Sequence, residues 1–156
     1  MVSVNQLRNY SFFEGFSDTQ LEQLASTATE EFYTAGHKIY TEGEPAENFY
    51  LLEEGKLVRI KEIPAGSQES EEVNVDFVRK GEVIGWSAFS KPYVYNMGAR
   101  CIDDSKLIAF NVVKLRELID KNHISLFVIE QAIWKTKLSR PDDERIYAFS
   151  LSSGCT

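Results

Sequence analysis

The feature that most restricts the fold of this chain is a series of short β-type runs between Glu31 and Phe110. Glycines or polar clusters separate runs that are rich in β-branched and aromatic residues. The runs read EFYTA, KIY, NFYLLEEG, KLVRIKEI, VNVDFVRK, MGARCI and KLIAF. Many short strands divided by turn residues are typical of an antiparallel β structure. The segment LVRIKEI alternates apolar and polar residues, which predicts a strand with one solvent-exposed face.

A short helix is predicted before these strands, in the segment FSDTQLEQLAS. Ser17 can cap it in a capping box with Gln20, and Phe16 can pack on Leu21. Leu24 continues the same apolar face. The sequence therefore predicts one N-terminal helix.

Two helices are predicted after the strands. The run VVKLRELI places one apolar stripe on the first of them, at Val112, Leu115, Leu118 and Ile119. Asn122 is suited to cap the second, longer helix, from Ile124 to Leu138. That helix is apolar on two sides, with Ile124, Phe127, Gln131, Trp134 and Leu138 on one and Leu126, Ile129 and Ile133 on the other. A surface helix needs one apolar stripe, so the second stripe predicts another packing partner.

This order of elements predicts a mainly β fold with about eight strands. We expect an antiparallel jelly-roll or β-roll barrel (a double-stranded β-helix), flanked by one N-terminal and two C-terminal helices. The expected domain covers residues 1–138, with the barrel at about 30–110 and the C-terminal helices at about 112–138. Residues 139–156 form a tail, in which Pro141 fits a helix stop and RIYAFSL is either a strand or a docked arm.

Charge and composition restrict the possible partners. The net charge of -7 opposes non-specific binding to nucleic acid or anionic membrane, and no block of Lys and Arg offsets it. The acidic stretch EIPAGSQESEEV is interpreted as a solvated hairpin loop. The start of the chain lacks the pattern of a secretory signal, and no apolar run approaches the roughly 20 residues of a spanning helix. Cys101 and Cys155 form no CxxC motif. We expect a cytoplasmic protein without a membrane segment.

The sequence gives little support for a catalytic function. Cupin-type metal enzymes share the jelly-roll architecture, but their sites need two or three histidines and a carboxylate around one ion. The chain has only His37 and His123, and neither lies close in sequence to a second ligand. No nucleophile–base arrangement and no GxxxxGK loop occurs. We expect no enzyme, no metal and no cofactor, and a cupin-like metal-dependent enzyme is the alternative from another class.

Four segments together resemble a known family. They are FFEGFSDTQLEQLA, YTAGHKIYTEGEPAENFYLLEEGKLVRI, GEVIGWSAF and LIAFNVVKLRELI. They are similar to the cyclic nucleotide-binding domain of the catabolite-activator and protein-kinase-regulatory type, from about Phe12 to about Leu138. The likeness includes a framework of glycines at the family's spacings, Gly36, Gly43, Gly55, Gly81 and Gly85. Such glycines permit tight turns between strands.

The resemblance also implies a phosphate-binding cassette in GEVIGWSAFSKPYVYNMGAR. In the family, a Gly-Glu pair opens the cassette and holds the ribose, and an arginine about ten residues later pairs with the cyclic phosphate. Gly85 matches the cassette glycine, Trp86 stands in place of the glutamate, and Tyr95 falls at or beside the arginine position. Arg100 matches no phosphate ligand. The resemblance therefore implies a pocket without its two charged anchors.

The candidate ligand site follows from this match, and it has two interpretations. Its residues are Gly85, Trp86, Ser87, Ala88, Tyr95 and Asn96. The aromatic rings could stack on a flat ligand such as a nucleobase, while Ser87, Tyr95 and Asn96 offer hydrogen bonds. Alternatively, the rings fill the space that a ligand would occupy. Either way, a cyclic phosphate without a cation should bind weakly.

The function expected is that of a non-enzymatic regulatory or sensor domain with weak or altered ligand specificity. Its ligand is a small molecule, either a cyclic nucleotide or another compound. The alternative is a degenerate domain that acts through protein contacts. In the resembling family the last helix forms a two-fold dimer, which implies a homodimer through Phe127, Gln131, Trp134 and Leu138. About eighteen residues follow Leu138, too few for a helix-turn-helix domain, so we expect no DNA binding by this chain alone.

Overall fold

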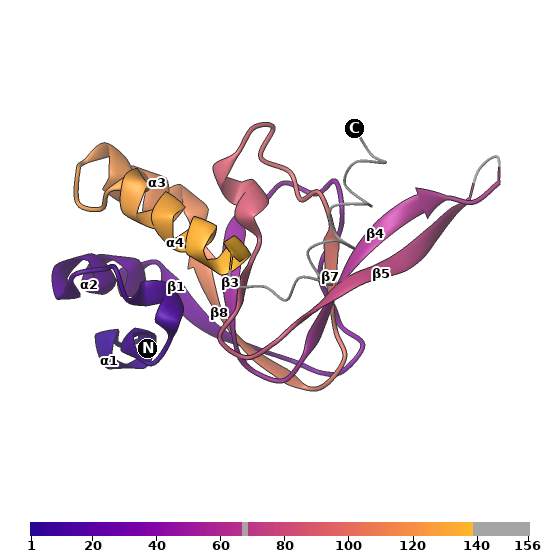
Figure 1. Cartoon of the computed structure of the whole chain (residues 1–156), viewed down its shortest axis with the longest axis horizontal. Helices are drawn as coiled ribbons and strands as arrows, with labels where there is room; N and C mark the ends of the chain where they lie inside the picture. The colour runs from indigo at the N-terminus through magenta and orange to yellow at the C-terminus, as the bar shows by residue number, and fades with distance from the viewer. Residues whose placement is uncertain (67–68, 139–156) are drawn as a thin grey trace.

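The computed structural model describes residues 1–66 and 69–138, and for residues 136–138 it describes the backbone alone. The leading helical segments are α1 (Val4–Arg8), the short 3-10 helix η1 (Ser11–Phe13) and α2 (Asp18–Ser26). The strands are β1 (Ala28–Tyr33), β2 (Lys38–Tyr40), β3 (Asn48–Glu54), β4 (Leu57–Pro64), β5 (Ser70–Val78), β6 (Val83–Ile84), β7 (Gly98–Cys101) and β8 (Ser105–Asn111). The 3-10 helix η2 (Trp86–Phe89) precedes β7, and α3 (Val112–Asp120) and α4 (Leu126–Leu138) follow β8 (Figure 1). The tail at 139–156, including Pro141 and the RIYAFSL segment, lies outside the described residues.

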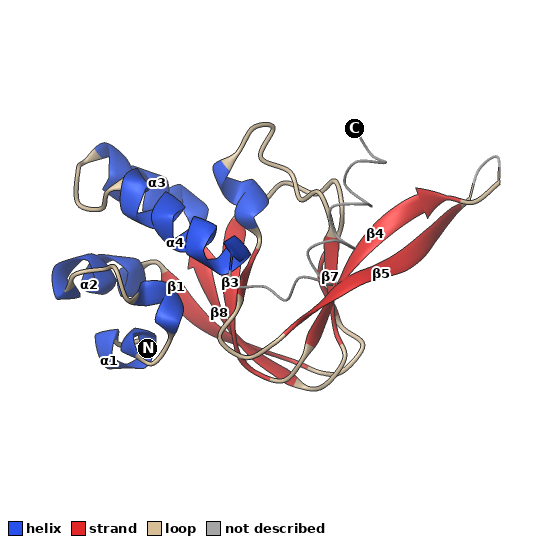
Figure 2. Cartoon of the chain, viewed as in Figure 1, coloured by secondary structure: helices blue, strands red, loops and turns tan. Residues whose placement is uncertain are grey.

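The eight strands form two antiparallel sheets of four strands (Figure 2). The first has the order β1-β8-β3-β6 and lies beside the helices, so we call it the helix-side sheet. The second has the order β2-β7-β4-β5, and its β4–β5 hairpin extends away from the helices; we call it the hairpin-side sheet. The predicted mainly β, antiparallel β-roll class is confirmed. The described strands do not join into one closed hydrogen-bonded barrel.

The N-terminal helix forms where the sequence predicts it. Ser17 Oγ accepts a hydrogen bond from the Gln20 backbone N–H at 3.1 Å, and Gln20 Oε1 accepts one from the Ser17 N–H at 2.8 Å. The same capping box recurs between Ser3 and Gln6, where it starts the five-residue helix α1. The prediction of one N-terminal helix was therefore incomplete, because the earlier box was missed.

The helix α1 is joined to the helix-side sheet through a buried carboxylate, that of Glu53 on β3. Its oxygen Oε1 accepts hydrogen bonds from Gln6 Nε2 at 2.8 Å and from Tyr10 Oη at 3.1 Å. Lys106 Nζ on β8 lies 3.4 Å from Glu53 Oε2. Burial, followed by the charge of Glu53, raises the pKa of Tyr10 to about 12. A buried carboxylate needs such partners, since an unpaired charge is costly away from water.

One part of the core lies between the helix-side sheet and the helices. Phe49 on β3 and Phe110 on β8 are register partners, and their rings stack with centroids 4.6 Å apart. Phe13 of η1 packs on Phe110 at 5.9 Å. All three are buried, so the aromatic residues that the sequence places in separate elements meet in one cluster. Aromatic rings of this size supply much of the apolar area that a small domain buries.

Two expectations about local structure are corrected in the β4–β5 hairpin. The predicted acidic loop EIPAGSQESEEV is mostly strand, because β4 continues to Pro64 and β5 begins at Ser70. The alternation in LVRIKEI does not leave one face wet, since Leu57 and Val58, which point to opposite faces of β4, are both buried.

The connection between the last two helices also differs from the prediction. Asn122 does not cap α4: its φ is +61°, and it ends α3. Its N–H donates to the Ile119 carbonyl at 3.0 Å, and the N–H of His123 donates to the Leu118 carbonyl at 2.9 Å. These two bonds form the Schellman motif, in which asparagine can take the left-handed position in place of glycine. The helix α4 starts only at Leu126.

Among the residues that the structure describes, no helix is both long enough and apolar enough to cross a membrane.

We predict that Gly55→Ala destabilises the domain more than Gly43→Ala does. Both glycines have a positive φ, +100° and +90°, so alanine costs about 1–2 kcal/mol at either position. A Cβ at Gly55 would also lie 2.3 Å from Ser105 Oγ and 2.6 Å from the Asp104 carbonyl. A Cβ at Gly43 would meet no such neighbour within 4 Å. Overpacking should add about 1–3 kcal/mol for Gly55→Ala alone. Urea denaturation of both variants measures the difference, and equal losses would contradict the prediction.

Candidate functional site

The cassette turn is built around Gly85, which the sequence matched to the family's cassette glycine. Gly85 has a φ of +92° and precedes η2. A Cβ here would lie 3.1 Å from both the Asn48 carbonyl and the Phe49 Cα. Glycine is required on both grounds, because the turn needs the left-handed region and packs directly on β3. The short 3-10 helix η2 follows Gly85 directly.

Tyr95 is turned into the β-roll, between the two sheets. Only 5% of its surface is exposed. Its ring stacks on Tyr40 of β2, with centroids 3.8 Å apart and planes 13° from parallel. Its hydroxyl donates a hydrogen bond to the Asn48 carbonyl at 2.7 Å. Tyr95, which the resemblance places at or beside the position of the phosphate-binding arginine, therefore makes its contacts with the protein itself.

Trp86, which the resemblance matches to the ribose-binding glutamate, contacts a different part of the molecule. Its half-buried ring stacks on Phe12 of η1, with centroids 5.7 Å apart. The two aromatic residues predicted to flank one ligand thus lie against different partners, Phe12 for Trp86 and Tyr40 for Tyr95. The structure does not bring these two rings together as a stacking pair.

The remaining predicted site residues lie close to one another. Ser87 Oγ donates to Asn96 Oδ1 at 3.2 Å and accepts from the Asn96 backbone N–H at 3.4 Å. Ala88 is fully buried under the turn. The polar groups expected to contact a ligand from Ser87 and Asn96 therefore bind each other.

The helix α3 fixes the cassette through Arg116, a residue that sequence reasoning missed. Arg116 Nη2 donates to the Ala88 carbonyl at 2.7 Å. Its guanidinium also lies over the Tyr93 ring, 4.3 Å from the centroid. An arginine in the first half of a C-terminal helix gives no sequence signal for this contact, because the cassette lies more than twenty residues earlier.

One row of residues crosses all four strands of the hairpin-side sheet on its inner face. Tyr40 on β2 pairs with Ala99 on β7, Ala99 with Arg59 on β4, and Arg59 with Asp76 on β5. We call these four residues the inner row. Ala99 belongs to the hydrophobic core, which places the row inside the roll. Tyr95 stacks on the first residue of this row.

Arg59 and Asp76 form a side-on ion pair at the far end of the inner row. Arg59 Nε donates to Asp76 Oδ1 at 2.6 Å, and Nη2 donates to Oδ2. The side chains are 18% and 1% exposed. Burial lowers the pKa of Arg59, but the hydrogen bonds and charge of Asp76 outweigh it, so the net shift is upward. The sequence does carry a signal for this pair, because Arg59 and Asp76 have opposite charges and lie at similar distances from the turn of the β4–β5 hairpin.

Arg100 lies on the opposite face of the same sheet. It follows the inward-facing Ala99, and successive side chains of a strand point to opposite faces. Arg100 Nη1 pairs with Glu72 Oε2 at 2.8 Å, and Lys38 Nζ binds Glu72 Oε1 at 2.9 Å. Hydrogen bonds from Lys38 and then Arg100 lower the pKa of Glu72. Arg100 therefore stays on the outside, as an arginine on an exposed strand face.

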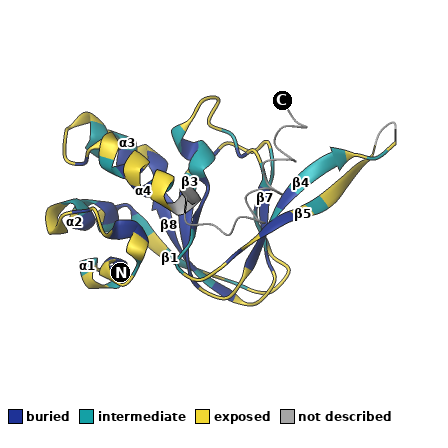
Figure 3. Ribbon diagram, in the orientation of Figure 1, coloured by how far each residue is buried: buried dark blue, intermediate teal, exposed yellow. Residues whose placement is uncertain are grey.

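The helix α4 has one buried and one exposed apolar face (Figure 3). Ile129 and Ala132 are buried, whereas Phe127 and Trp134 are 65% and 61% exposed. Gln131, on the same stripe, is also exposed, and the Leu138 side chain lies outside the described atoms. A groove of about 240 Å³ borders this stripe between α4 and the η1–α2 region. Phe127 and Trp134 thus form the predicted second apolar face, but Ile124, which was grouped with them, is buried before α4, and Leu126, which was grouped with Ile129, is exposed.

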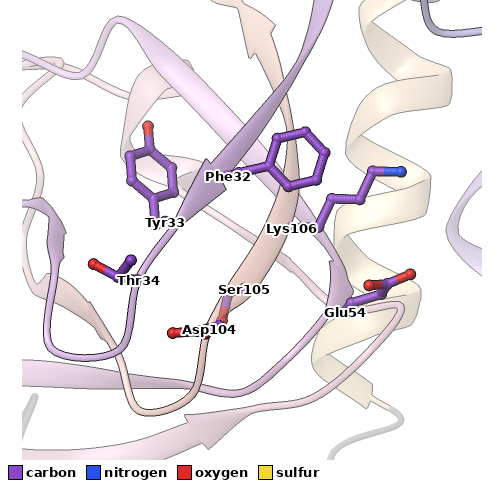
Figure 4. A pocket seen from close by; sticks show the side chains of 7 residues that line it. All are labelled: Phe32, Tyr33, Thr34, Glu54, Asp104, Ser105 and Lys106. Atoms are coloured by element: carbon purple, nitrogen blue, oxygen red, sulfur yellow. The ribbon is translucent and has the colours of Figure 1, made fainter.

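A separate cavity of about 280 Å³ lies at the end of the helix-side sheet (Figure 4). It is lined by Phe32, Tyr33, Thr34, Glu54, Asp104, Ser105 and Lys106, and contains none of the predicted site residues. Across the described part of the chain, no group of three or more His, Cys, Asp or Glu side chains is arranged to hold a metal ion. His37 instead stacks on Tyr33 at 4.6 Å.

The two antiparallel sheets, the glycine-led cassette turn and the flanking helices define the class of regulatory β-roll domains. The model of the family "Cyclic nucleotide-binding domain" matches residues 30–122, more than half of the chain. The chain therefore belongs to the cyclic nucleotide-binding domain family, as its sequence motifs indicated.

Known proteins and structures agree with this assignment. A segment is 39% identical over 67 residues to a cAMP-dependent protein kinase regulatory subunit of Candida albicans, covering 38% of this chain and 15% of that protein. A cGMP-dependent protein kinase of Caenorhabditis elegans is 26% identical over 82 residues, covering 53% of this chain and 10% of the kinase. The chain thus spans a small part of these relatives. A solved structure from Geobacter metallireducens, described as a cyclic nucleotide-binding protein, has a TM-score of 0.78 at 29% identity, covering 90% of this chain and 98% of that one.

A further solved structure shares the fold. The regulatory subunit of a cAMP-independent protein kinase A from Trypanosoma cruzi, bound to guanosine, has a TM-score of 0.72 at 21% identity. It covers 97% of this chain and 50% of that chain.

We predict that the tyrosines inside the roll resist ionisation until the domain unfolds. Burial is the largest cause that raises the pKa of Tyr40, Tyr50 and Tyr95 above the usual value of about 10. The unfolded chain therefore loses these protons first, so stability is full below about pH 10 and falls as the pH rises above it. Tyrosinate absorbance and near-ultraviolet circular dichroism, followed together, should change in one step. Ionisation of these tyrosines near pH 10 with the dichroism intact would contradict the prediction.

Proposed function

We propose that this chain is a non-enzymatic regulatory domain, of a cytoplasmic protein, in which neither cAMP nor cGMP is the physiological ligand. The observation that carries the proposal is Tyr95, whose ring stacks on Tyr40 and whose hydroxyl binds the Asn48 carbonyl. A cyclic phosphate carries a full negative charge and loses water on entering the roll. That loss is tolerable only where a guanidinium and N–H groups replace the water.

Both charged anchors of the family are replaced here by groups that bind elsewhere in the protein. Trp86 removes the carboxylate and stacks on Phe12, and Tyr95 removes the guanidinium. Arg100 offers no substitute, because it pairs with Glu72 on the outer face. The ligand specificity is therefore proposed to be altered, in favour of molecules without a phosphate charge. The trypanosomal regulatory subunit bound to guanosine, described as cAMP-independent, is one protein of the same fold with such a ligand.

We predict that cAMP and cGMP bind this domain with dissociation constants in about the millimolar range. Losing one charged hydrogen bond typically costs about 1.5–3 kcal/mol, and each 1.4 kcal/mol is about tenfold in affinity. Two lost anchors therefore move a micromolar site by about a hundredfold or more. Titration calorimetry measures the constants. Fluorescence of Trp86 gives a second reading in a Trp134→Phe variant, which removes the exposed tryptophan of α4.

The control for this titration is the pair of substitutions Trp86→Glu and Tyr95→Arg, which restores both anchors. It should bind cAMP more tightly than the wild type, by at least tenfold if one anchor becomes functional. Arg100→Leu should leave the affinity unchanged, because Arg100 is on the outer face. A micromolar or tighter constant for the wild-type domain would refute the proposal.

The domain's output is proposed to pass through protein contacts at α4, most simply with a second copy of the chain. The exposed stripe formed by Phe127, Gln131 and Trp134 supports this part of the proposal, since large aromatic side chains dominate the energy of protein interfaces. A two-fold arrangement would place the same stripe of each copy against the other. A degenerate domain that binds no small molecule and acts by such contacts alone is the second candidate.

We predict that the wild-type domain dimerises and that Phe127→Ser with Trp134→Ser makes it monomeric. Each serine removes a large exposed ring from the stripe while leaving the buried residues Ile129 and Ala132 untouched. Light scattering over a concentration series measures the mass. Phe32→Ser is the matched control, because Phe32 is 71% exposed but lies on β1. A monomeric wild type at high concentration, or a dimer that survives both serines, would rule out this interface.

A further inference from the structure

The inner row contains a charged pair that the family resemblance did not lead us to expect. Arg59 and Asp76 lie on the same inner face as Tyr40 and Ala99, two core residues. A buried ion pair rarely stabilises a fold better than apolar residues of similar volume would. Its place among core residues therefore calls for a role other than stability.

The pair places one cation and one anion on the inner face of the hairpin-side sheet, and a second pair, Lys61 with Glu42 at 3.1 Å, lies further along β4. Arg59 supplies a guanidinium on the wall of the roll, so the cation missing at Tyr95 has a counterpart on another strand. Asp76 already neutralises that guanidinium through the bonds from Nε and Nη2. An anion that approached Arg59 would have to displace the Asp76 carboxylate. If it did not, it would lie beside that carboxylate and be repelled by the like charge.

The position of the pair also connects it with the cassette. Only Ala99 separates Arg59 from Tyr40 along the inner row, and Tyr40 carries the stacked ring of Tyr95. Alanine is the smallest side chain of the row and leaves the guanidinium and the tyrosine ring as neighbours across it. A molecule that replaced the Tyr95 ring on Tyr40 would thus come within reach of the Arg59–Asp76 pair.

We infer that Arg59 and Asp76 determine ligand charge in this domain, and that Asp76 makes the interior select an uncharged molecule, such as a nucleoside, over an anionic cyclic nucleotide. The inference rests on the proposed function, because it concerns the same interior. An uncharged ligand with both donors and acceptors can bind the carboxylate and the guanidinium without breaking the pair. A cyclic phosphate can use the guanidinium only at the expense of Asp76.

The experiment compares ligands that differ only in the cyclic phosphate and its charge: adenosine with cAMP, and guanosine with cGMP. Titrations use the wild type and a Tyr95→Ala background, which removes the ring that covers Tyr40. In that background we expect each nucleoside to bind at least tenfold more tightly than its cyclic phosphate. Adding Asp76→Asn should raise the affinity for the cyclic phosphates at least tenfold, by freeing Arg59. Adding Arg59→Met to that variant should abolish the gain.

Asp76→Asn leaves a buried guanidinium without its counter-ion and is expected to lower stability. If the variant is unfolded in the absence of ligand, its near-ultraviolet circular dichroism is recorded with millimolar cAMP and with millimolar adenosine. Only cAMP should restore the signal of the folded domain. The inference is overturned if Asp76→Asn leaves the affinity for cyclic phosphates unchanged, or if the gain persists without Arg59. It is also overturned if no variant binds either ligand class, or if neither ligand restores an unfolded variant.

The failure of the proposed function has a different signature. Tight cAMP binding by the wild type would refute that function while leaving the role of the ion pair open to the same test. In that case Asp76→Asn is titrated alone, without Tyr95→Ala. A further gain in cAMP affinity supports the inference, and an unchanged or lower affinity overturns it.

Discussion

The stacking of Tyr95 on Tyr40 is the contact on which the rest of the site depends. It joins the end of the cassette to the hairpin-side sheet, while the Tyr95 hydroxyl joins it to the helix-side sheet at the Asn48 carbonyl. One side chain thus connects both sheets across the roll. The chain makes this connection from its own sequence, with neutral groups that need no counter-ion.

Near this contact, polar groups of the cassette form hydrogen bonds with other groups of the protein. Ser87 binds Asn96, and the Ala88 carbonyl accepts from Arg116. Each bond uses a polar group that could otherwise contact a ligand. Polar groups that are paired in this way gain little from a weak ligand, because binding must first break an existing hydrogen bond. A competing ligand therefore needs to match the interior more closely than a cyclic phosphate does.

Sequence reasoning found the fold and located the cassette, but it did not find the direction of the side chains. Glycines at turns and the Ser17 capping box are local signals, and they were sufficient for the element order. Tyr95 was named as a site residue from the sequence, yet its contact with Tyr40 depends on the packing of two sheets. Arg59 reads as a solvent-facing residue of an alternating strand. The inward face of β4 is the one that carries Leu57 and Arg59, and the pairing of β4 with β5 places Asp76 opposite Arg59.

The same geometry links the interior to the helices without any ligand. Arg116 lies on α3, and it holds both the Ala88 carbonyl and the Tyr93 ring, on the two sides of the cassette loop. On the other flank, Trp86 stacks on Phe12, which also lines the groove beside α4. A movement of Tyr95 out of the roll would pull on both contacts at once, since the cassette residues between them are one short continuous segment. A ligand that binds one position of Tyr95, inside or outside the roll, more tightly than the other would shift the equilibrium between the two positions. The size of the shift is set by the difference between its two affinities. The proposed α4 interface therefore lies where such a shift can alter protein contacts.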